Sequence, residues 1–122
     1  MRTVPGQDPD AGVSWLGVDH REERGAVVVA VAGEVDVVTV PDLEERIDAV
    51  VREDLPLVLD LAGVTFLDST GLSALVRCHR RGLLGGGFRL VVANRAVSRP
   101  LELTALDDLL EVYPTLEAAL EG

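Results

Sequence analysis

The stretch "LVLDLAGVTFLDSTGLSAL", residues 57–75, holds the clearest boundary between two kinds of secondary structure in the chain. Its first five residues, 57–61, form an apolar run typical of a buried strand. The tetrapeptide DSTG, residues 68–71, then precedes a helical spacing of apolar residues. Because Asp and Ser side chains accept hydrogen bonds from the free backbone N–H groups of a helix start, the stretch predicts a strand, a loop and a helix over 69–82.

The segments before this stretch predict a hairpin followed by a helix. Residues 13–20 alternate roughly between apolar and polar side chains and residues 26–33 are almost continuously apolar, so both are expected to be strands, joined by a turn over 21–25. The helix follows from Thr39, a favourable N-cap, and from Pro41, which is tolerated in a first turn. Its expected apolar stripe consists of Leu43, Ile47, Val50 and Val51.

The segments after the stretch continue the alternation. The expected elements are a strand, a helix, a strand and a helical turn or two, over 88–94, 96–106, 109–114 and 115–122. Helices that link successive strands indicate parallel pairing. The predicted fold is α/β: a single domain over 13–122, with a mixed, mostly parallel sheet of four to five strands and about four helices. Residues 1–12 are expected to form a flexible tail.

Composition limits the classes of function. The chain has 122 residues and a formal net charge of −10, and all of its 11 basic residues are arginine. Such an acidic protein repels phosphate backbones and anionic lipids, so neither nucleic acid nor a membrane is expected as a direct partner. No apolar run approaches the roughly 18 residues of a membrane-spanning helix, and the first residues lack the apolar segment of a signal peptide. A cytoplasmic location is expected, and the single cysteine, Cys78, excludes an internal disulfide.

Nucleophilic catalysis by Ser69 has weak support in the sequence. The G-x-S-x-G pattern of hydrolases is absent, since residues 67–71 read LDSTG. His79 follows Ser69 by ten residues on the same predicted helix, which separates them by about 15 Å of helical rise. His79 also falls on the expected apolar side of that helix, so it is predicted to pack in the core. The other residues expected on that side are Leu72, Leu75, Val76 and Leu83. No catalytic residue is predicted.

Phosphate-binding loops, phosphate-accepting aspartates and metal sites are not indicated either. The glycine-rich segment 82–88 lacks the G-K-[ST] ending of a phosphate-binding loop, and the chain has no lysine. Asp60 lies on a predicted strand, as in receiver domains, but the lysine expected beside such an aspartate is missing. Glu34 and Asp36 alone do not make a metal-ligand set. The sequence therefore predicts neither a metal nor a cofactor.

Two interpretations of DSTG remain open from the residues alone. In the first, Asp68 and Ser69 only cap the helix, and Gly71 only permits close packing on a strand. In the second, Ser69 is an exposed serine that another protein phosphorylates, which adds about two negative charges at one position and disrupts an interface there. Gly71 is expected to let the strand or a partner approach closely, so Gly71→Val should damage binding or stability. Helix propensity leaves room for Gly71→Ala to stabilise the fold while it weakens the complex.

The segment "GVTFLDSTGLSALV", residues 63–76, resembles the signature of STAS domains, especially those of bacterial anti-sigma factor antagonists. The resemblance extends from about Val13 to Leu120, and the D-S-[ST]-G-L order is fairly specific. Three further segments are similar to the family pattern: "VAGEVDVVTVPDLEERI", "LVLDLAGV" and "GGGFRLVVANRAVSRPLELTAL".

The resemblance implies a partner-switching function without catalysis. In this family the unphosphorylated antagonist binds an anti-sigma factor that is itself a serine kinase, and this binding frees a sigma factor. Phosphorylation of the antagonist by that kinase ends the binding. A serine phosphatase then removes the phosphate and restores binding. The alternative within the family is a constitutive scaffold or transport-complex subunit whose serine is never modified. The resemblance implies phosphorylation at Ser69, with Thr70 as a secondary candidate, and partner binding by Asp36, Asp68, Ser69, Thr70 and Gly71.

Overall fold

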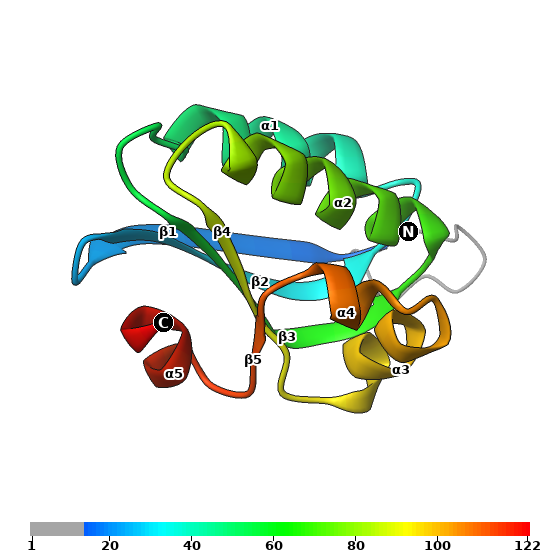
Figure 1. Cartoon of the computed structure of the whole chain (residues 1–122). Coiled ribbons are helices and arrows are strands. Elements are labelled where there is room, and N and C mark those ends of the chain that lie inside the picture. The colour runs from blue at the N-terminus through cyan, green and yellow to red at the C-terminus, as the bar shows by residue number, and fades with distance from the viewer. Residues whose placement is uncertain (1–13) are drawn as a thin grey trace, which may run out of the picture.

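The computed structural model describes residues 14–122, so the tail predicted over 1–12 lies outside the described residues. Strands and helices alternate through most of this part of the chain (Figure 1). In chain order they are β1 (Leu16–Glu23), β2 (Ala26–Val35), α1 (Val40–Val50), β3 (Leu57–Leu67), α2 (Ser69–Leu83), β4 (Phe88–Val91), α3 (Arg95–Leu103), α4 (Leu106–Leu109), β5 (Val112–Tyr113) and α5 (Leu116–Glu121). The predicted order is confirmed, with one additional short helix, α4.

The five strands form one mixed sheet in the order β1-β2-β3-β4-β5. β1 pairs with β2 antiparallel and the other neighbours pair parallel, which confirms the predicted sheet. The hairpin turn between β1 and β2 is only two residues long, and Arg24 and Gly25 both have positive φ, 49° and 77°. Such a turn matches the twist of antiparallel strands, so β1 continues to Glu23, beyond its predicted end.

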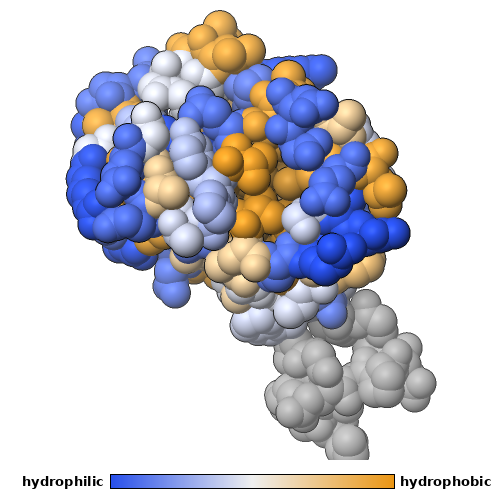
Figure 2. Space-filling model, turned by 60° about the horizontal axis from the view of Figure 1, so that its bottom comes forward, coloured by the Kyte–Doolittle hydropathy of each residue, from blue (hydrophilic) through white to orange (hydrophobic). Residues whose placement is uncertain are grey.

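Helices cover both faces of the sheet. α1 and α2 lie side by side over one face, and α5 lies on the opposite side (Figure 1). α3 packs against β3, and its buried residues Val97 and Leu101 belong to the same core cluster as those of α1 and α2. The larger apolar core cluster includes Leu43 of α1 and Leu75 of α2, where these helices pack on the sheet. A smaller cluster, with Val58 and Ala119, lies under α5. Figure 2 shows the side of the molecule that lies at the bottom of Figure 1. Apolar side chains gather near the middle of this side, and hydrophilic side chains surround them.

The buried side of α2 agrees with the predicted one at Leu75, which is buried, and at Leu72, which packs against the core, but it differs at two other positions. Leu83 is 74% exposed and His79 is only half-buried, so the prediction of a core histidine is wrong. Small side chains at the contact allow the helix to lie close to the sheet, and this close packing decides which side is buried. The buried residues of α2 are Gly71, Ala74, Leu75 and Cys78.

β3 is longer than the sequence predicts and leads directly into the DSTG segment. Its pairing with β2 shifts register at two places, so β3 carries extra residues where a loop was expected. The Asp60 carboxylate accepts a hydrogen bond from the Ala62 N–H at 3.0 Å. The Asn94 amide donates to the carbonyls of Ala62 and Val64 at 3.1 and 3.0 Å. The two side chains thereby form hydrogen bonds with backbone N–H and C=O groups of β3 that would pair with a neighbouring strand if the register were regular.

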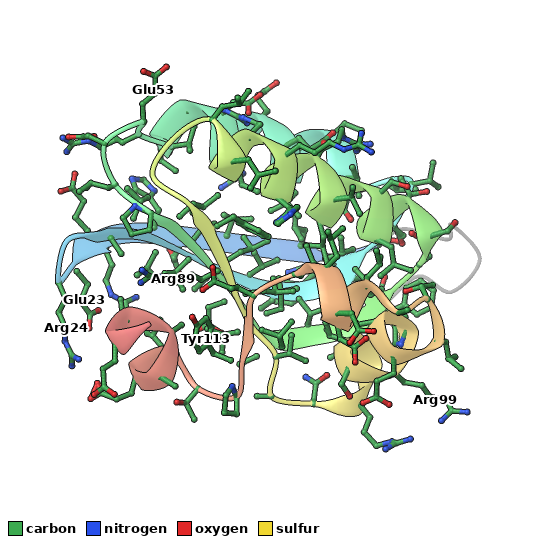
Figure 3. All side chains as sticks on the ribbon, in the orientation of Figure 1. Glu23, Arg24, Glu53, Arg89, Arg99 and Tyr113 are labelled. Atoms are coloured by element: carbon green, nitrogen blue, oxygen red, sulfur yellow. The ribbon has the colours of Figure 1, made fainter. Side chains whose placement is uncertain are left out.

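The C-terminal part also departs from the predicted boundaries. The expected helix over 96–106 divides into α3 and α4 because Ala105 adopts a left-handed conformation, φ 57°, that a continuous helix does not contain. α5 is attached to the sheet by polar contacts that Figure 3 helps to locate. Arg89 donates to the Ala119 carbonyl at 2.9 Å, and Arg24 forms an ion pair with Glu117 at 2.7 Å.

Candidate functional site

Two segments meet where β2 and β3 end side by side. Val35 and Leu67 are partners in the parallel register, and the backbone N–H of Asp68 donates to the Val35 carbonyl at 3.2 Å. The turn that follows β2, residues 36–39, therefore lies next to the start of α2. The carboxyl edge of parallel strands is where open α/β sheets place their binding sites.

Asp68 is the N-cap of α2. Its Oδ1 accepts a hydrogen bond from the Gly71 N–H at 3.0 Å, so the capping prediction is confirmed for this aspartate. Ser69 is the first residue of α2 and is exposed, whereas Thr70 is half-buried. Because the Asp68 carboxylate already caps the helix, the Ser69 hydroxyl is available to other molecules. It lies at a helix start, where free backbone N–H groups favour an anion.

Gly71 is buried beneath the first turn of α2. A methyl group at this position would contact Leu67 Cδ1 and would lie 3.0 Å from both the Cγ1 atom and the carbonyl oxygen of Val35. The glycine therefore lets the ends of β2 and β3 lie directly below the helix. These contacts favour the opposite prediction for Gly71→Ala, a loss of stability, because the added methyl would press against the Val35 carbonyl and the Leu67 side chain.

Asp36 holds the turn between β2 and α1. Its Oδ1 accepts from the backbone N–H groups of Val38 and Thr39 at 3.0 and 3.1 Å, and its own N–H donates to Thr39 Oγ1 at 3.0 Å. Its Oδ2 accepts from the Ser14 hydroxyl. Thr39 is the N-cap of α1, as predicted, but its side chain makes no capping bond and instead donates to the Glu34 carbonyl at 2.7 Å.

The hydrogen bonds to Asp36 also determine its charge state. Burial raises the pKa of the Asp36 carboxyl, but hydrogen bonds from Ser14, Thr39 and Val38 outweigh that effect, so the pKa lies below its ordinary value. The carboxylate is half-buried and ionised at neutral pH. It stabilises the shape of the turn, which is a more specific role than that of a solvated loop carboxylate.

Exposed apolar side chains flank this region, and the sequence analysis did not identify them. Val37 and Val38 are 67% and 60% exposed, and Phe66, near the end of β3, is 50% exposed. We refer to Val37, Val38 and Phe66 as the apolar border. Large apolar side chains grouped on a surface are a usual mark of an interaction site. The one signal available in the sequence was the valine pair, which stands between the end of a strand and the N-cap of a helix.

Other types of site find no support in the part of the chain that the structure describes. Within residues 14–122, no three His, Cys, Asp or Glu side chains are grouped so as to hold a metal ion. None of the helices there combines the length and the apolar composition needed to cross a bilayer. The region at the ends of β2 and β3 instead offers a protein-accessible surface with an exposed serine, two carboxylates and the apolar border.

The similarity of this chain to a known family extends over most of the domain. The family model described as "STAS domain" matches residues 18–119. The chain belongs to the STAS domain family. The family and fold predicted from the segment 63–76 are thereby confirmed, and Ser69 lies at the start of α2 of this STAS domain.

This STAS domain is similar to proteins named as anti-sigma factor antagonists. It is 34% identical over 108 residues to the anti-sigma-F factor antagonist RsfB of Mycobacterium tuberculosis, and the match covers 88% of each chain. The crystal structure of an anti-sigma factor antagonist from Mycobacterium paratuberculosis matches with a TM-score of 0.81 and 40% identity, over 93% of this chain and 95% of that one. SpoIIAA, solved in two forms, shares the fold. The unphosphorylated form matches with a TM-score of 0.65 and 18% identity, over 86% of this chain and 94% of that one. The phosphorylated form matches with a TM-score of 0.61 and 17% identity, over 86% of this chain and 97% of that one.

Proposed function

We propose that this STAS domain is an anti-sigma factor antagonist controlled by phosphorylation of Ser69. The observation that carries the proposal is the position of Ser69, which is the exposed first residue of α2 beside a carboxylate that already caps the helix. Similarity to two proteins named as antagonists, at 34% and 40% identity, supports the class. SpoIIAA, a protein of the same fold, has been solved in a phosphorylated form.

In the proposed cycle, the unphosphorylated protein binds an anti-sigma factor in the cytoplasm and thereby frees a sigma factor. The anti-sigma factor is a serine kinase that transfers the γ-phosphoryl group of ATP to the Ser69 oxygen, while the hydroxyl proton passes to a kinase base and ADP leaves. A serine phosphatase hydrolyses the phosphate ester and restores binding. The chain supplies the acceptor hydroxyl and no catalytic residue, cofactor or metal.

The phosphate changes binding more than folding. A helix start favours an anion by about 0.3–1 kcal/mol when exposed, so the domain tolerates phosphate on Ser69. In an interface, the same phosphate must lose its water or lie against a surface shaped for a hydroxyl, and such a change costs on the order of 2–5 kcal/mol. The carboxylate of Asp68 next to Ser69 adds to the local negative charge. The interface effect is the larger one, so binding is lost while the fold persists.

Of the five residues proposed for partner binding, two carry hydroxyl groups at the start of α2 and three hold the surrounding backbone in place. Ser69 is exposed and Thr70 is half-buried, so Ser69 is the more accessible of the two hydroxyls and the proposed main site of phosphorylation. Asp36, Asp68 and Gly71 are engaged in hydrogen bonds or packing that hold the turn and the helix start in place. They support the surface on which the hydroxyls lie.

The test combines the purified protein with the purified anti-sigma-F factor of Mycobacterium tuberculosis, ATP and Mg²⁺. We expect binding before phosphorylation, one phosphoryl group on Ser69 by mass spectrometry, and release of the complex afterwards. Ser69→Ala should bind and stay unmodified, and the matched control Ser73→Ala, at an exposed position of the same helix, should behave as wild type. Phosphate mainly on Thr70, or no binding by the wild type, would contradict the proposal. Binding without any phosphorylation would favour the constitutive scaffold.

A further inference from the structure

We propose that Val37 and Val38 are the apolar contact residues for the kinase partner, and that Asp36 is a positioning residue that presents them. The inference rests on the proposed function and deepens it. It assigns the centre of the interface to the turn between β2 and α1. It also commits to the chemistry of the partner, which is a protein surface with an apolar patch bordered by basic side chains.

The exposed valines lie close to the start of α2. Val37 and Val38 are 67% and 60% exposed, although both are apolar. They follow Val35 by two and three residues, and Val35 pairs with Leu67 immediately before the start of α2. The turn therefore lies beside the start of α2, and a protein surface docked around Ser69 would reach it. Removing these side chains from water on binding is favourable.

The turn is already ordered in the free protein by hydrogen bonds on both of its sides. The Asp36 carboxylate accepts from the N–H groups of Val38 and Thr39, and the Asp36 N–H donates to Thr39 Oγ1. On the other side of the turn, the Trp15 carbonyl accepts from the Glu34 N–H at 2.7 Å. A turn held in this way loses little conformational entropy on binding, so the two valines are presented in advance of the partner.

The charged residues around the turn and the start of α2 are mainly acidic. The segments 33–43 and 64–76 contain acidic residues and no arginine, and the chain has no lysine. The exposed Arg95 follows Asn94, which donates to the Val64 carbonyl at 3.0 Å. The acidic residues are Glu34, Asp36, Asp42 and Asp68. Of these, Asp42 is paired with Arg46 of its own helix, and the other three give the surface a negative character. Basic residues on the partner complement this charge, whereas an anionic lipid surface is repelled.

The role of Asp36 follows from the way its oxygens are used. Oδ1 accepts two backbone N–H groups and Oδ2 accepts the Ser14 hydroxyl, so the carboxylate is satisfied within the domain. A residue of this kind acts on the partner through the turn that it holds. Asparagine keeps the Oδ1 acceptor without the charge, whereas alanine removes the acceptor, and the two substitutions therefore separate positioning from direct charge recognition.

The experiment measures affinity for the purified anti-sigma-F factor of Mycobacterium tuberculosis by calorimetry, without ATP. The double variant Val37→Ser/Val38→Ser should bind at least about tenfold more weakly, because two buried apolar contacts are lost. Its melting temperature should match that of wild type, since both side chains are exposed. Leu83→Ser is the matched control: Leu83 is 74% exposed and ends α2, about 21 Å from Ser69 by helical rise, so its affinity should be unchanged.

Two further measurements test the partner chemistry and the role of Asp36. Wild-type affinity should fall as salt rises, because the complementary charges are screened. Asp36→Ala should weaken binding about as much as the valine double variant, and Asp36→Asn should restore most of the affinity. If Asp36→Asn binds as poorly as Asp36→Ala, the carboxylate contacts the partner directly and the positioning role is overturned.

The outcomes distinguish this inference from the proposed function. If wild type does not bind the anti-sigma factor, the proposed function fails and the inference fails with it. If wild type binds and the valine double variant binds equally well, the inference alone is overturned. A loss of affinity for Leu83→Ser equal to that of the valine variant also overturns it, since the effect would then not belong to the turn.

Discussion

Single residues decide the shape of the surface around Ser69, and two aspartates do so in different ways. Asp68 caps α2 through the Gly71 N–H, as its place before a helix predicts. Asp36 lies four residues before the first residue of α1 and closes the preceding turn through Val38 and Thr39. Both carboxylates satisfy backbone groups that would otherwise lack partners. Under the proposed function their contribution to binding is indirect, since they hold the groups that a partner would contact.

The lowered pKa of Asp36 leads to a prediction about acid stability. A group whose pKa is lower in the folded protein contributes stability that is present above its ordinary pKa, about 4, and is lost as the pH falls through the folded value. Asp36→Ala should reduce the free energy of unfolding by about 1–2 kcal/mol at pH 7, and this difference should shrink at about pH 3. Urea denaturation at both pH values measures it. Asp19→Ala, at an exposed position of β1, is the control. A difference independent of pH would contradict the prediction.

Cys78 is predicted to be unreactive in the folded protein. It is 7% exposed, at the packed side of α2, and burial raises the pKa of its thiol to about 11. The reactive thiolate is therefore scarce at pH 8 and also shielded. Iodoacetamide should modify native protein on the order of a hundredfold more slowly than protein unfolded in urea, as mass spectrometry over time can show. Native modification within a few-fold of the unfolded rate would rule this out.

At the scale of elements, the position of α2 depends on how closely it approaches the sheet. Gly71 at one end lies over Val35 and Leu67, and Gly82 at the other end lies over Phe88, where an added methyl would come 2.8 Å from the Phe88 Cβ atom. The helix is also linked to α1 by exposed ion pairs, Arg77–Glu44 at 2.6 Å among them. Exposed pairs contribute less than about 1 kcal/mol each, so close packing is the main determinant of the helix position.

Gly71→Ala should therefore destabilise the domain although alanine is the better helix former. The propensity gain of up to about 1 kcal/mol is smaller than the cost of displacing Val35 and Leu67, about 1–3 kcal/mol for overpacking. Gly71→Val should be worse, and Ser73→Ala, two residues further along on the exposed side, should be nearly neutral. Thermal or urea denaturation of the three variants provides the comparison. A Gly71→Ala variant more stable than wild type would show that the neighbours move aside freely.

At the scale of the whole molecule, the fold keeps the core that stabilises the domain apart from the proposed phosphorylation site. The core clusters lie within the layers of the sheet and its helices, whereas Ser69 and the apolar border lie at the surface where β2 and β3 end. A charge added to Ser69 therefore alters the partner surface without entering the core. This arrangement suits a protein that must bind, be modified and be released in the folded state.

This separation predicts opposite outcomes for two substitutions of Ser69. Ser69→Asp should bind the anti-sigma factor at least about tenfold more weakly, while its melting temperature stays within about 2 °C of wild type because the residue is exposed. Ser69→Ala should bind as tightly as the unmodified protein and resist phosphorylation. Calorimetry and thermal denaturation test the two properties separately. Tight binding by Ser69→Asp, or its unfolding, would refute the separation.

The sequence by itself determined the order of elements, the mixed parallel sheet and the position of the serine. These features depend on local patterns: apolar runs for β2 and β3, and a capping aspartate before α2. The same local rules placed Asp68 and Ser69 correctly at the helix start. The segment 63–76 also carried enough family pattern to predict the STAS domain that the family comparison confirms.

Only the tertiary structure decided which side of α2 is buried, how far β3 extends and what surrounds Ser69. His79 lies off the packed side because Gly71, Ala74 and Cys78 allow the closer approach to the sheet. The division of α3 from α4 at Ala105 and the exposure of Val37 and Val38 depend equally on the packing of distant segments. The spacing of apolar residues along the chain predicts which side of a helix is apolar. Which residues are buried depends in addition on the side chains of other strands and helices that pack at each position.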